Sequence, residues 1–545
     1  MRPMRITYYI GSLGIAVVVI CLWFLCSPVI GAAIDRDPVQ ILSLRDAIKY
    51  GIQHNLDIKA EEMNIPIGKK GVVINKSAFD PLFSASISSK DQKAPASTIM
   101  TPEDFSIYRD VKATVGLQKR FLTGLESSLS VSSLKSMNNS SIDALRPQYY
   151  NVVVLDLTQP LLKDFGVGVN SAHIRISEKQ LLQAADIYLD KAVRISGQIE
   201  NAYYNLALAE EILACKLESR RLAQELLDAN KEKFKAGLVP ITEIEEAETA
   251  VASRDEEVIQ ARAQTETAVN NLLDLLGCHS YSDDPICKKT IKVQALSVQD
   301  KDLPRLDDSM TLALRRRPDL EAQRLAVESS DIKLKYYRNQ RLPRLDLEAT
   351  LGINGLSGGD RPVHFVGTDY ASPLVGDYWD SVKDMTQDRQ WYVGIRLSYP
   401  IGNRGPEARY RQADLEKMQA IYRLKRLEDT SETEVKNAFI ASKRALERIK
   451  VAEHFENLAQ ITLSQEMERL KEGLSDTFHI LKYQNDVIAA KIKKITAIAD
   501  FNKGLASLYS ATGTNLERYG IVAEIPGDTN QDEKQQLRFP LVDSK

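Results

Sequence analysis

Apolar residues recur at alternating steps of four and three along two long stretches of the chain. Such spacing places one narrow apolar stripe along a helix, as coiled-coil packing requires. The first stripe runs from Leu181 to Leu213, and the second runs from Val435 to Ala452. Both stripes are rich in alanine, so we expect the packed helices to approach each other closely.

Each stripe belongs to a unit of three predicted helices: a short one, a very long one, and a last one after a Gly-Leu turn. Their ranges are 42–78, 168–236 and 240–276 in the first unit, and 306–340, 404–472 and 476–512 in the second. At about 1.5 Å per residue, each very long helix would span roughly 100 Å. The two shorter helices of a unit, placed end to end, nearly match that length. We therefore expect them to run alongside the long helix, with both Gly-Leu turns at one tip and the strands at the opposite end.

Alternating apolar and polar residues predict strands between the short and the very long helix. Every second residue over 345–353 is apolar, 391–399 alternates likewise between aromatic ends, and 153–158 follows the same pattern. About ten residues of such alternation is the weak signature of a transmembrane barrel strand, although an ordinary half-buried sheet also shows it. A polar stretch of 36 residues over 355–390, where an external loop would lie, favours the barrel.

The two units are copies of one another. Leu44 coincides with Leu306, and Pro81 with Pro343, at the same offset of 262 residues, and the two Gly-Leu turns match in the same order further on. An internal repeat sets the organisation of the whole chain. We divide the chain into a first repeat over 34–277, a connector over 278–305, a second repeat over 306–513 and a polar tail over 514–545.

The first 33 residues have the features of a secretory signal peptide. Two arginines precede an uncharged run from Ile6 to Ile34, which ends in small residues at Gly31 and Ala33. A basic start, an apolar core and a small-residue exit are typical of a cleaved signal, here over 1–33. The run is also long enough to span a bilayer, so an uncleaved anchor is the alternative.

Charge and chemistry exclude two classes of function. The chain has 71 Lys and Arg against 74 Asp and Glu, whereas a nucleic-acid-binding domain is strongly basic. Its six histidines form no His-x-x-x-His pair, its cysteines form no Cys-x-x-Cys pair, and no acid–base or nucleophile constellation appears. We therefore expect no nucleic-acid partner, no enzyme activity and no cofactor or metal.

Several motifs occur in duplicate and in a fixed order. They are Leu42-Ser-Leu-Arg-Asp-Ala-Ile-Lys-Tyr-Gly-Ile-Gln-His-Asn-Leu-Asp57 with Arg317-Pro-Asp-Leu-Glu-Ala322, Leu157-Thr-Gln-Pro-Leu-Leu162 with Leu397-Ser-Tyr-Pro-Ile-Gly402, and Phe234-Lys-Ala-Gly-Leu238 with Leu470-Lys-Glu-Gly-Leu474. With these motifs, over roughly residues 42–515, the chain resembles the TolC-like outer-membrane efflux proteins.

The resemblance implies an α+β membrane protein. Its fold would be a trimeric transmembrane β-barrel in the cell outer membrane, continued by a long antiparallel α-helical coiled-coil tunnel in the periplasm. The implied function is a passive exit duct of a tripartite efflux or type I secretion system. The implied partners are two further copies of the chain, outer-membrane lipid, a periplasmic adaptor protein and an inner-membrane transporter.

The resemblance also assigns the periplasmic tip and its constriction to the turns of the two repeats. The residues are Gly237, Leu238 and Glu243 in the first repeat and Gly473, Leu474, Asp476, His479 and Lys482 in the second. His479 and Lys482 stand where well-known members of the family place constriction aspartates. Because a ring of identical side chains sets the field in a pore, we expect a mixed or basic ring here.

The first repeat contains more strands than the family's usual total of four per protomer allows. Residues 111–117 and 125–131 flank a turn near Thr123-Gly124 and predict an additional hairpin. Either the barrel has more strands, or this hairpin projects beyond the membrane. We favour projection.

Cys278 and Cys287 lie close together in the connector between the repeats. In an oxidising periplasm we expect a disulfide between them, with two free thiols as the alternative.

A second function remains open from the sequence. The chain could be a periplasmic coiled-coil structural or adaptor protein, anchored by an uncleaved N-terminal segment. Such a protein needs no barrel, so the alternating strands and the long polar loop count against it.

Overall fold

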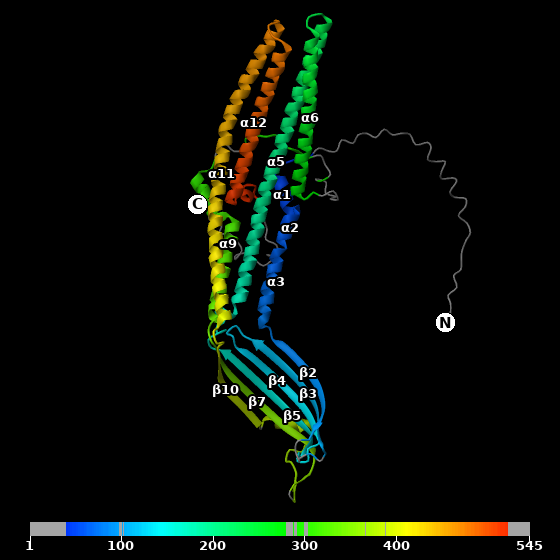
Figure 1. Cartoon of the computed structure of the whole chain (residues 1–545), viewed down its shortest axis with the longest axis vertical. Coiled ribbons are helices and arrows are strands. Elements are labelled where there is room, and N and C mark those ends of the chain that lie inside the picture. Colours follow the sequence, from blue (N-terminus) through cyan, green and yellow to red (C-terminus); the bar gives the residue numbers. More distant parts are fainter. Residues whose placement is uncertain are drawn as a thin grey trace, which may run out of the picture.

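The computed structural model describes residues 40–96, 101, 103–278, 287, 291–298, 303–365, 367–386 and 388–521. The predicted signal peptide over 1–33 and the tail after residue 521 lie outside the described residues. The described chain is elongated, with its helices at one end and an antiparallel sheet at the other (Figure 1).

Two helices of 64 and 68 residues form the long axis of the molecule. Each is followed by a helix of 36 residues that packs back against it, so that two helical hairpins lie side by side (Figure 1). The helices are α5 (Ala172–Lys235) with α6 (Ile241–Leu276), and α11 (Arg404–Lys471) with α12 (Thr477–Thr512). No helix among the described residues is both long enough and apolar enough to cross a membrane.

The predicted apolar stripes are the packed faces of the two long helices. Ala192, Ile199 and Leu206 of α5 are buried, as is Val435 of α11. Small residues bring the backbones close. A Cβ atom on Gly504 of α12 would lie only 2.8 Å from the hydroxyl of Ser442 in α11.

The short helix that opens each repeat is interrupted rather than continuous. In the first repeat, the side chain of Asn55 accepts hydrogen bonds from the backbone N–H groups of Asp57 and Ile58, which starts a new helix. In the second, Pro318 starts a new helix at its first position, where the missing N–H has no partner to lose. The resulting helices are α1 (Leu44–His54), α2 (Leu56–Glu62), α3 (Asn64–Lys76) and η1 (Ser77–Phe79), and α8 (Leu306–Arg316) and α9 (Pro318–Gln340).

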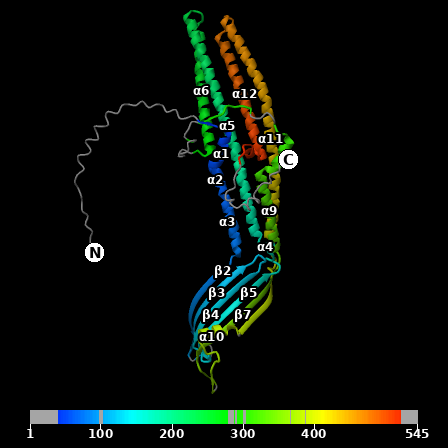
Figure 2. The same ribbon diagram turned by 180° about the vertical axis from the view of Figure 1, so that it is seen from behind.

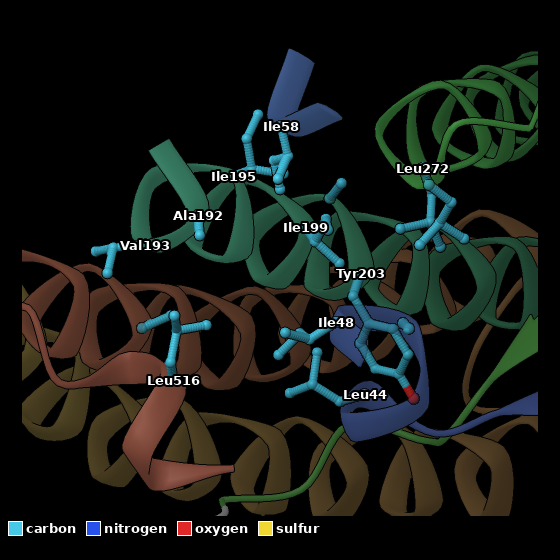
Figure 3. Packing of buried hydrophobic residues seen from close by; sticks show 14 of the residues in the cluster. Leu44, Ile48, Ile58, Ala192, Val193, Ile195, Ile199, Tyr203, Leu272 and Leu516 are labelled. Carbon is cyan, nitrogen blue, oxygen red and sulfur yellow. The ribbon is translucent and has the colours of Figure 1, made fainter. Parts of the chain in front are cut away.

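The largest hydrophobic core among the described residues lies where α1, α5 and α6 meet (Figure 3), and these helices meet near the middle of the molecule (Figure 1). Ile48 of α1 and Ile199 of α5 are fully buried there, and Leu516 joins them from the short α13 (Asn515–Arg518). A two-stranded parallel ladder of β1 (Gln40–Leu42) and β6 (Ile291–Val293) borders this core. It therefore joins the start of the first repeat to the connector.

Six strands form one continuous antiparallel sheet in the order β10-β7-β5-β4-β3-β2. They are β2 (Leu82–Pro95), β3 (Phe105–Arg120), β4 (Glu126–Asn138), β5 (Leu145–Pro160), β7 (Arg344–Asp360) and β10 (Asp388–Ser398). The first repeat contributes four strands and the second contributes two, and the repeats join where β5 pairs with β7.

The prediction that the additional hairpin projects beyond the membrane is wrong. The hairpin is β3 and β4, and both strands lie inside the sheet, paired over 13 consecutive residues with each other and along their other edges with β2 and β5. Because antiparallel strands pair in sequence order when the turns are short, the hairpin extends the sheet rather than leaving it.

The connection from β7 to β10 has structure of its own. It contains β8 (Val363–Phe365), β9 (Thr368–Tyr370), α10 (Tyr378–Lys383) and η2 (Asp384–Thr386). At the opposite end of the sheet, α4 (Val167–Asn170) leads from β5 into α5.

Candidate functional site

One face of the six-stranded sheet is apolar and exposed. The pairing register aligns one large apolar side chain from every strand in a single row: Phe83, Leu117, Leu129, Leu155, Leu351 and Trp391. Five of these six are exposed, Trp391 to 76%. A water-soluble sheet would bury such a face, so this one requires an apolar environment.

We call this exposed face the apolar band. Its members, all exposed and all on the same side of the sheet by register, are Phe83, Ile87, Val111, Val115, Leu117, Leu129, Val131, Leu347, Leu351, Trp391, Val393, Ile395 and Leu397.

The opposite face of the sheet is polar. The hydroxyls of Thr114 and Ser132 lie 3.0 Å apart across β3 and β4, and Thr350 donates to the carboxylate of Asp156 at 2.7 Å across β7 and β5. Arg396 and Glu348 form an ion pair at 2.9 Å across β10 and β7. A polar lining opposite an apolar band is the arrangement of a membrane barrel strand.

The two Gly-Leu turns lie at the ends of the hairpins remote from the sheet (Figure 1). Gly237 and Gly473 adopt positive φ angles of 75° and 71°, which a glycine accepts without strain. The N–H of the following leucine closes each turn, from Leu238 to Lys233 O at 2.9 Å and from Leu474 to Arg469 O at 2.8 Å. Both leucine side chains are mostly exposed.

Three residues near the turns connect the two hairpins, and we call them the tip link. The N–H of Thr477, the first residue of α12, donates to the Glu243 carboxylate of α6 at 3.1 Å. The side-chain amide of Asn230 in α5 donates to the Thr477 hydroxyl at 2.7 Å and to the Glu243 carbonyl at 3.2 Å. Glu243 thus lies against the N-terminus of α12, just after the turn of the second hairpin.

The other predicted constriction residues stay within their own helix. Asp476 is the N-cap of α12, and its carboxylate accepts from the His479 N–H at 2.9 Å and lies 2.6 Å from His479 Nδ1. These bonds, first that of the backbone N–H, lower the pKa of Asp476. Lys482 lies one turn further along and faces the ring of Tyr483. The structure therefore pairs Asp476 with His479, and pairs Glu243 with Thr477.

Arg254 makes a second connection between the hairpins, which was not predicted from the sequence. The Arg254 guanidinium of α6 is buried, and it donates to Gln484 Oε1 at 3.3 Å and to Asn485 Oδ1 at 2.9 Å, both in α12. It also donates to the Ser219 carbonyl of α5. The sequence does contain a sign of this contact. Arg254 is a charged residue at a position of α6 that lies on the buried face, between Ala247 and Val258.

Cys278 and Cys287 are joined by a disulfide. Across the part of the chain that the structure describes, no group of three or more His, Cys, Asp or Glu side chains could hold a metal ion.

A family model described as "Outer membrane efflux protein" matches residues 48–278 and 310–514. The chain belongs to this family. The resemblance to TolC-like proteins is thereby confirmed, and an outer-membrane location with helices in the periplasm follows from it.

Two curated outer-membrane proteins are similar to this chain in sequence. Outer membrane protein TolC of Escherichia coli (strain K12) is 25% identical over 205 residues, which cover 37% of each chain. Outer membrane efflux protein BepC of Brucella suis biovar 1 (strain 1330) is 23% identical over 478 residues, which cover 86% of this chain and 85% of BepC.

Solved channels share the fold. The Campylobacter jejuni CmeC outer membrane channel has a TM-score of 0.63 and 18% identity, covering 91% of this chain and 89% of CmeC. The outer-membrane channel OprN has a TM-score of 0.62 and 17% identity, covering 86% and 90%. The predicted fold of a barrel continued by a helical tunnel is confirmed.

Proposed function

We propose that this chain forms the passive outer-membrane duct of a tripartite efflux or type I secretion system, through which substrate passes from the periplasm to the exterior. The observation that carries this proposal is the six-stranded sheet, apolar and exposed on one face and polar on the other. Its outer strands β2 and β10 each have one edge without a strand partner among the described residues. In lipid such edges must be paired, because no water is present to satisfy the backbone groups.

Pairing with further copies of the chain would close the sheet. In a homotrimer, three sheets of six strands give a barrel of 18 strands. Barrels of about this size enclose an aqueous channel. This is wider than the family's usual four strands per protomer would allow.

The width of the sheet matches that of the helical layer above it. Next to the sheet, α3, α5, α9 and α11 pack in that order. Four helices at about 8–10 Å between axes span roughly 30–40 Å. Six strands about 4.8 Å apart, tilted by about 40°, cover roughly 35–40 Å of circumference. Barrel and tunnel would therefore join with little narrowing.

The helical tip is the proposed contact for the partners. Leu238 and Leu474 expose apolar side chains at the turns, remote from the membrane. Such side chains suit a periplasmic adaptor protein, which would couple the duct to an inner-membrane transporter. Glu243, Asp476, His479 and Lys482, close behind the turns, would form the constriction, with acidic and basic groups mixed.

Fractionation and planar-bilayer recording test the proposal together. We expect the full-length protein to sediment with the outer membrane, to need detergent for extraction and to form ion-conducting pores. A protein that is soluble without detergent, or that sediments with the inner membrane, would contradict the duct and favour the periplasmic adaptor. The exposed apolar band already argues against the adaptor, because a periplasmic protein would leave that band in water.

A further inference from the structure

The connection between β7 and β10 folds back onto the outer wall of the sheet. Its residues 374–386, which include α10 and η2, pack on β7 and β5 at the end remote from the helices (Figure 2). We call residues 374–386 the cover segment. The N–H of Gly376 donates to Gly358 O at 2.9 Å, and the N–H of Gly358 donates to Leu374 O at 3.2 Å, which ties the segment to β7.

The register shows which face the cover segment occupies. Asn151 of β5 is paired with Gly355 of β7, one same-face step beyond Val153 and Ile353. The Asn151 side chain donates to the Ser381 hydroxyl of α10 at 2.6 Å, and both residues are buried. The segment therefore lies on the apolar side of the sheet, directly beyond the apolar band, and not on the polar side.

A buried hydrogen bond and a close backbone approach hold the cover segment against the sheet. Ser357 of β7 is buried and donates to the Asp377 carbonyl at 2.6 Å. Gly355 permits the close approach, because a Cβ atom there would clash with the Ser381 carbonyl. Asp377 caps α10 in a capping box with Asp380, which fixes the orientation of the helix.

The outer side of the cover segment exposes apolar side chains next to the ion pair of Lys383 and Asp380. Trp379 is 64% exposed, and Val382, one turn along the same side of α10, is also exposed. Leu374 and Val375 are exposed at its start. The ring of Tyr378 contacts Trp379 at 5.4 Å between centroids and Tyr149 of β5 at 5.9 Å, both edge to face.

We propose that the cover segment is an interfacial anchor, and that Trp379 lies at the boundary between the headgroups and acyl chains of the outer leaflet. The occupant is lipid, because the segment continues the apolar band on the same outer wall of the barrel. A tryptophan beside the edge of such a band is favoured at the headgroup level, where an amphipathic ring contacts both environments. This inference rests on the proposed membrane barrel and adds the depth at which the barrel is held.

Depth-dependent fluorescence quenching tests the anchor. The chain has three tryptophans, Trp23, Trp379 and Trp391. Trp23→Phe with Trp391→Phe leaves Trp379 as the sole probe in the full chain. The protein is reconstituted in phosphatidylcholine vesicles whose acyl chains are brominated either near the glycerol or near the methyl end. The reference variant carries Trp379→Phe and Leu347→Trp in the same background, which moves the probe into the apolar band.

We expect bromine near the glycerol to quench Trp379 about twofold more strongly than bromine near the methyl end, and the reverse order for the reference variant. If the two lipids quench Trp379 equally, or if bromine near the methyl end quenches it more strongly, Trp379 does not lie at the interface and the proposal is overturned. If iodide quenches Trp379 and brominated lipid does not, Trp379 lies in water. If neither quenches it, Trp379 is covered by a neighbouring copy of the chain. Either result overturns the anchor. If the reference probe also escapes the lipid quencher, the membrane barrel itself fails.

Discussion

The backbone N–H of Thr477 donates to the carboxylate of Glu243 across 3.1 Å, and this bond joins two helical hairpins from different repeats. The carboxylate lies at the N-terminus of α12, where the helix dipole favours negative charge. Together with Asn230 it holds the hairpins against each other next to the turns. Next to the turns, the two hairpins are therefore joined to each other by polar contacts, whereas the middle of the helical part is held by a hydrophobic core.

Removing the Glu243 carboxylate should loosen the tip. We expect Glu243→Ala to weaken the contact by about 0.5–2 kcal/mol, the range for losing a helix cap, and to raise the conductance of the pore in planar bilayers. Glu246→Ala, at an exposed position of the same helix, is the matched control. Equal conductance in the two variants would contradict a role of the tip link in holding the hairpins.

Arg254 should matter more than its exposed counterparts on α6. Arg254→Met leaves the buried Gln484 side chain without its donor, which should cost about 1–3 kcal/mol and speed proteolysis of the hairpin ends. Arg262→Met, at an exposed position on the same helix, should have little effect. The prediction fails if limited proteolysis treats both variants alike.

The charge of the proposed constriction can be tested by ion selectivity. Replacing His479 and Lys482 by Asp should shift the reversal potential in a salt gradient towards cation selectivity, because a pore-end ring of carboxylates attracts cations. Lys443→Asp, at an exposed position of α11 away from the tip, is the control for a Lys-to-Asp change outside the constriction. An unchanged reversal potential in the His479 and Lys482 variant would count against the tip assignment.

The buried Glu200 should make the helical domain less stable as the pH rises. Burial raises its pKa to about 7, although Tyr519, whose hydroxyl donates to Glu200 Oε2 at 3.1 Å, and Arg518 act in the opposite direction. Because the folded pKa exceeds the unfolded value, the folded state binds more protons between about pH 4.5 and 7, and stability falls across that window.

Glu200→Gln removes this titration. We expect its unfolding temperature in detergent to exceed that of the parent at pH 8 and to approach it near pH 5. The corresponding difference in the free energy of unfolding is up to about 3 kcal/mol. Asp186, whose burial also raises its pKa to about 7, should leave a residual dependence of the same sign. Glu266→Gln, at an exposed position, is the control. Parallel pH profiles of parent and Glu200→Gln would refute the role of Glu200.

The disulfide and the signal peptide can be tested in one thiol count. With Cys278 and Cys287 bridged, and Cys21 and Cys26 removed with residues 1–33, the denatured and unreduced protein should react with maleimide at Cys215 alone. Reduction should add two thiols. Three reactive thiols before reduction would mean either an intact N-terminus or an open bridge, which peptide mapping distinguishes.

The helical part of the fold could be predicted in detail because its packing is periodic and local. The stripe through Ala192 and Ile199 follows from spacing alone, and the turns at Gly237 and Gly473 follow from glycine's tolerance of positive φ. The breaks at Asn55 and Pro318 also have local causes, although the predicted helices ran through them.

The candidate site could be predicted only in part, because its contacts join residues far apart in the chain. The predicted tip residues include Glu243 but not Thr477, which lies 234 positions away in the sequence. From the sequence, Arg254 could be recognised only as a charged residue on the buried face of α6. Its hydrogen-bond partners in α12 depend on how the two hairpins pack.

The duplicated units, the long helices, the alternation of the strands and the membership of the efflux family can all be recognised in the amino-acid sequence. Each of these features depends on periodicity or on the order of motifs. Periodicity and motif order can be recognised without knowing which distant residues come into contact. The folded chain was needed to show that β3 and β4 extend the sheet, that the cover segment lies on the apolar side of the sheet, and that Glu243 contacts Thr477. Alternation specifies two faces of a strand, but the pairing register between strands decides which elements share a face.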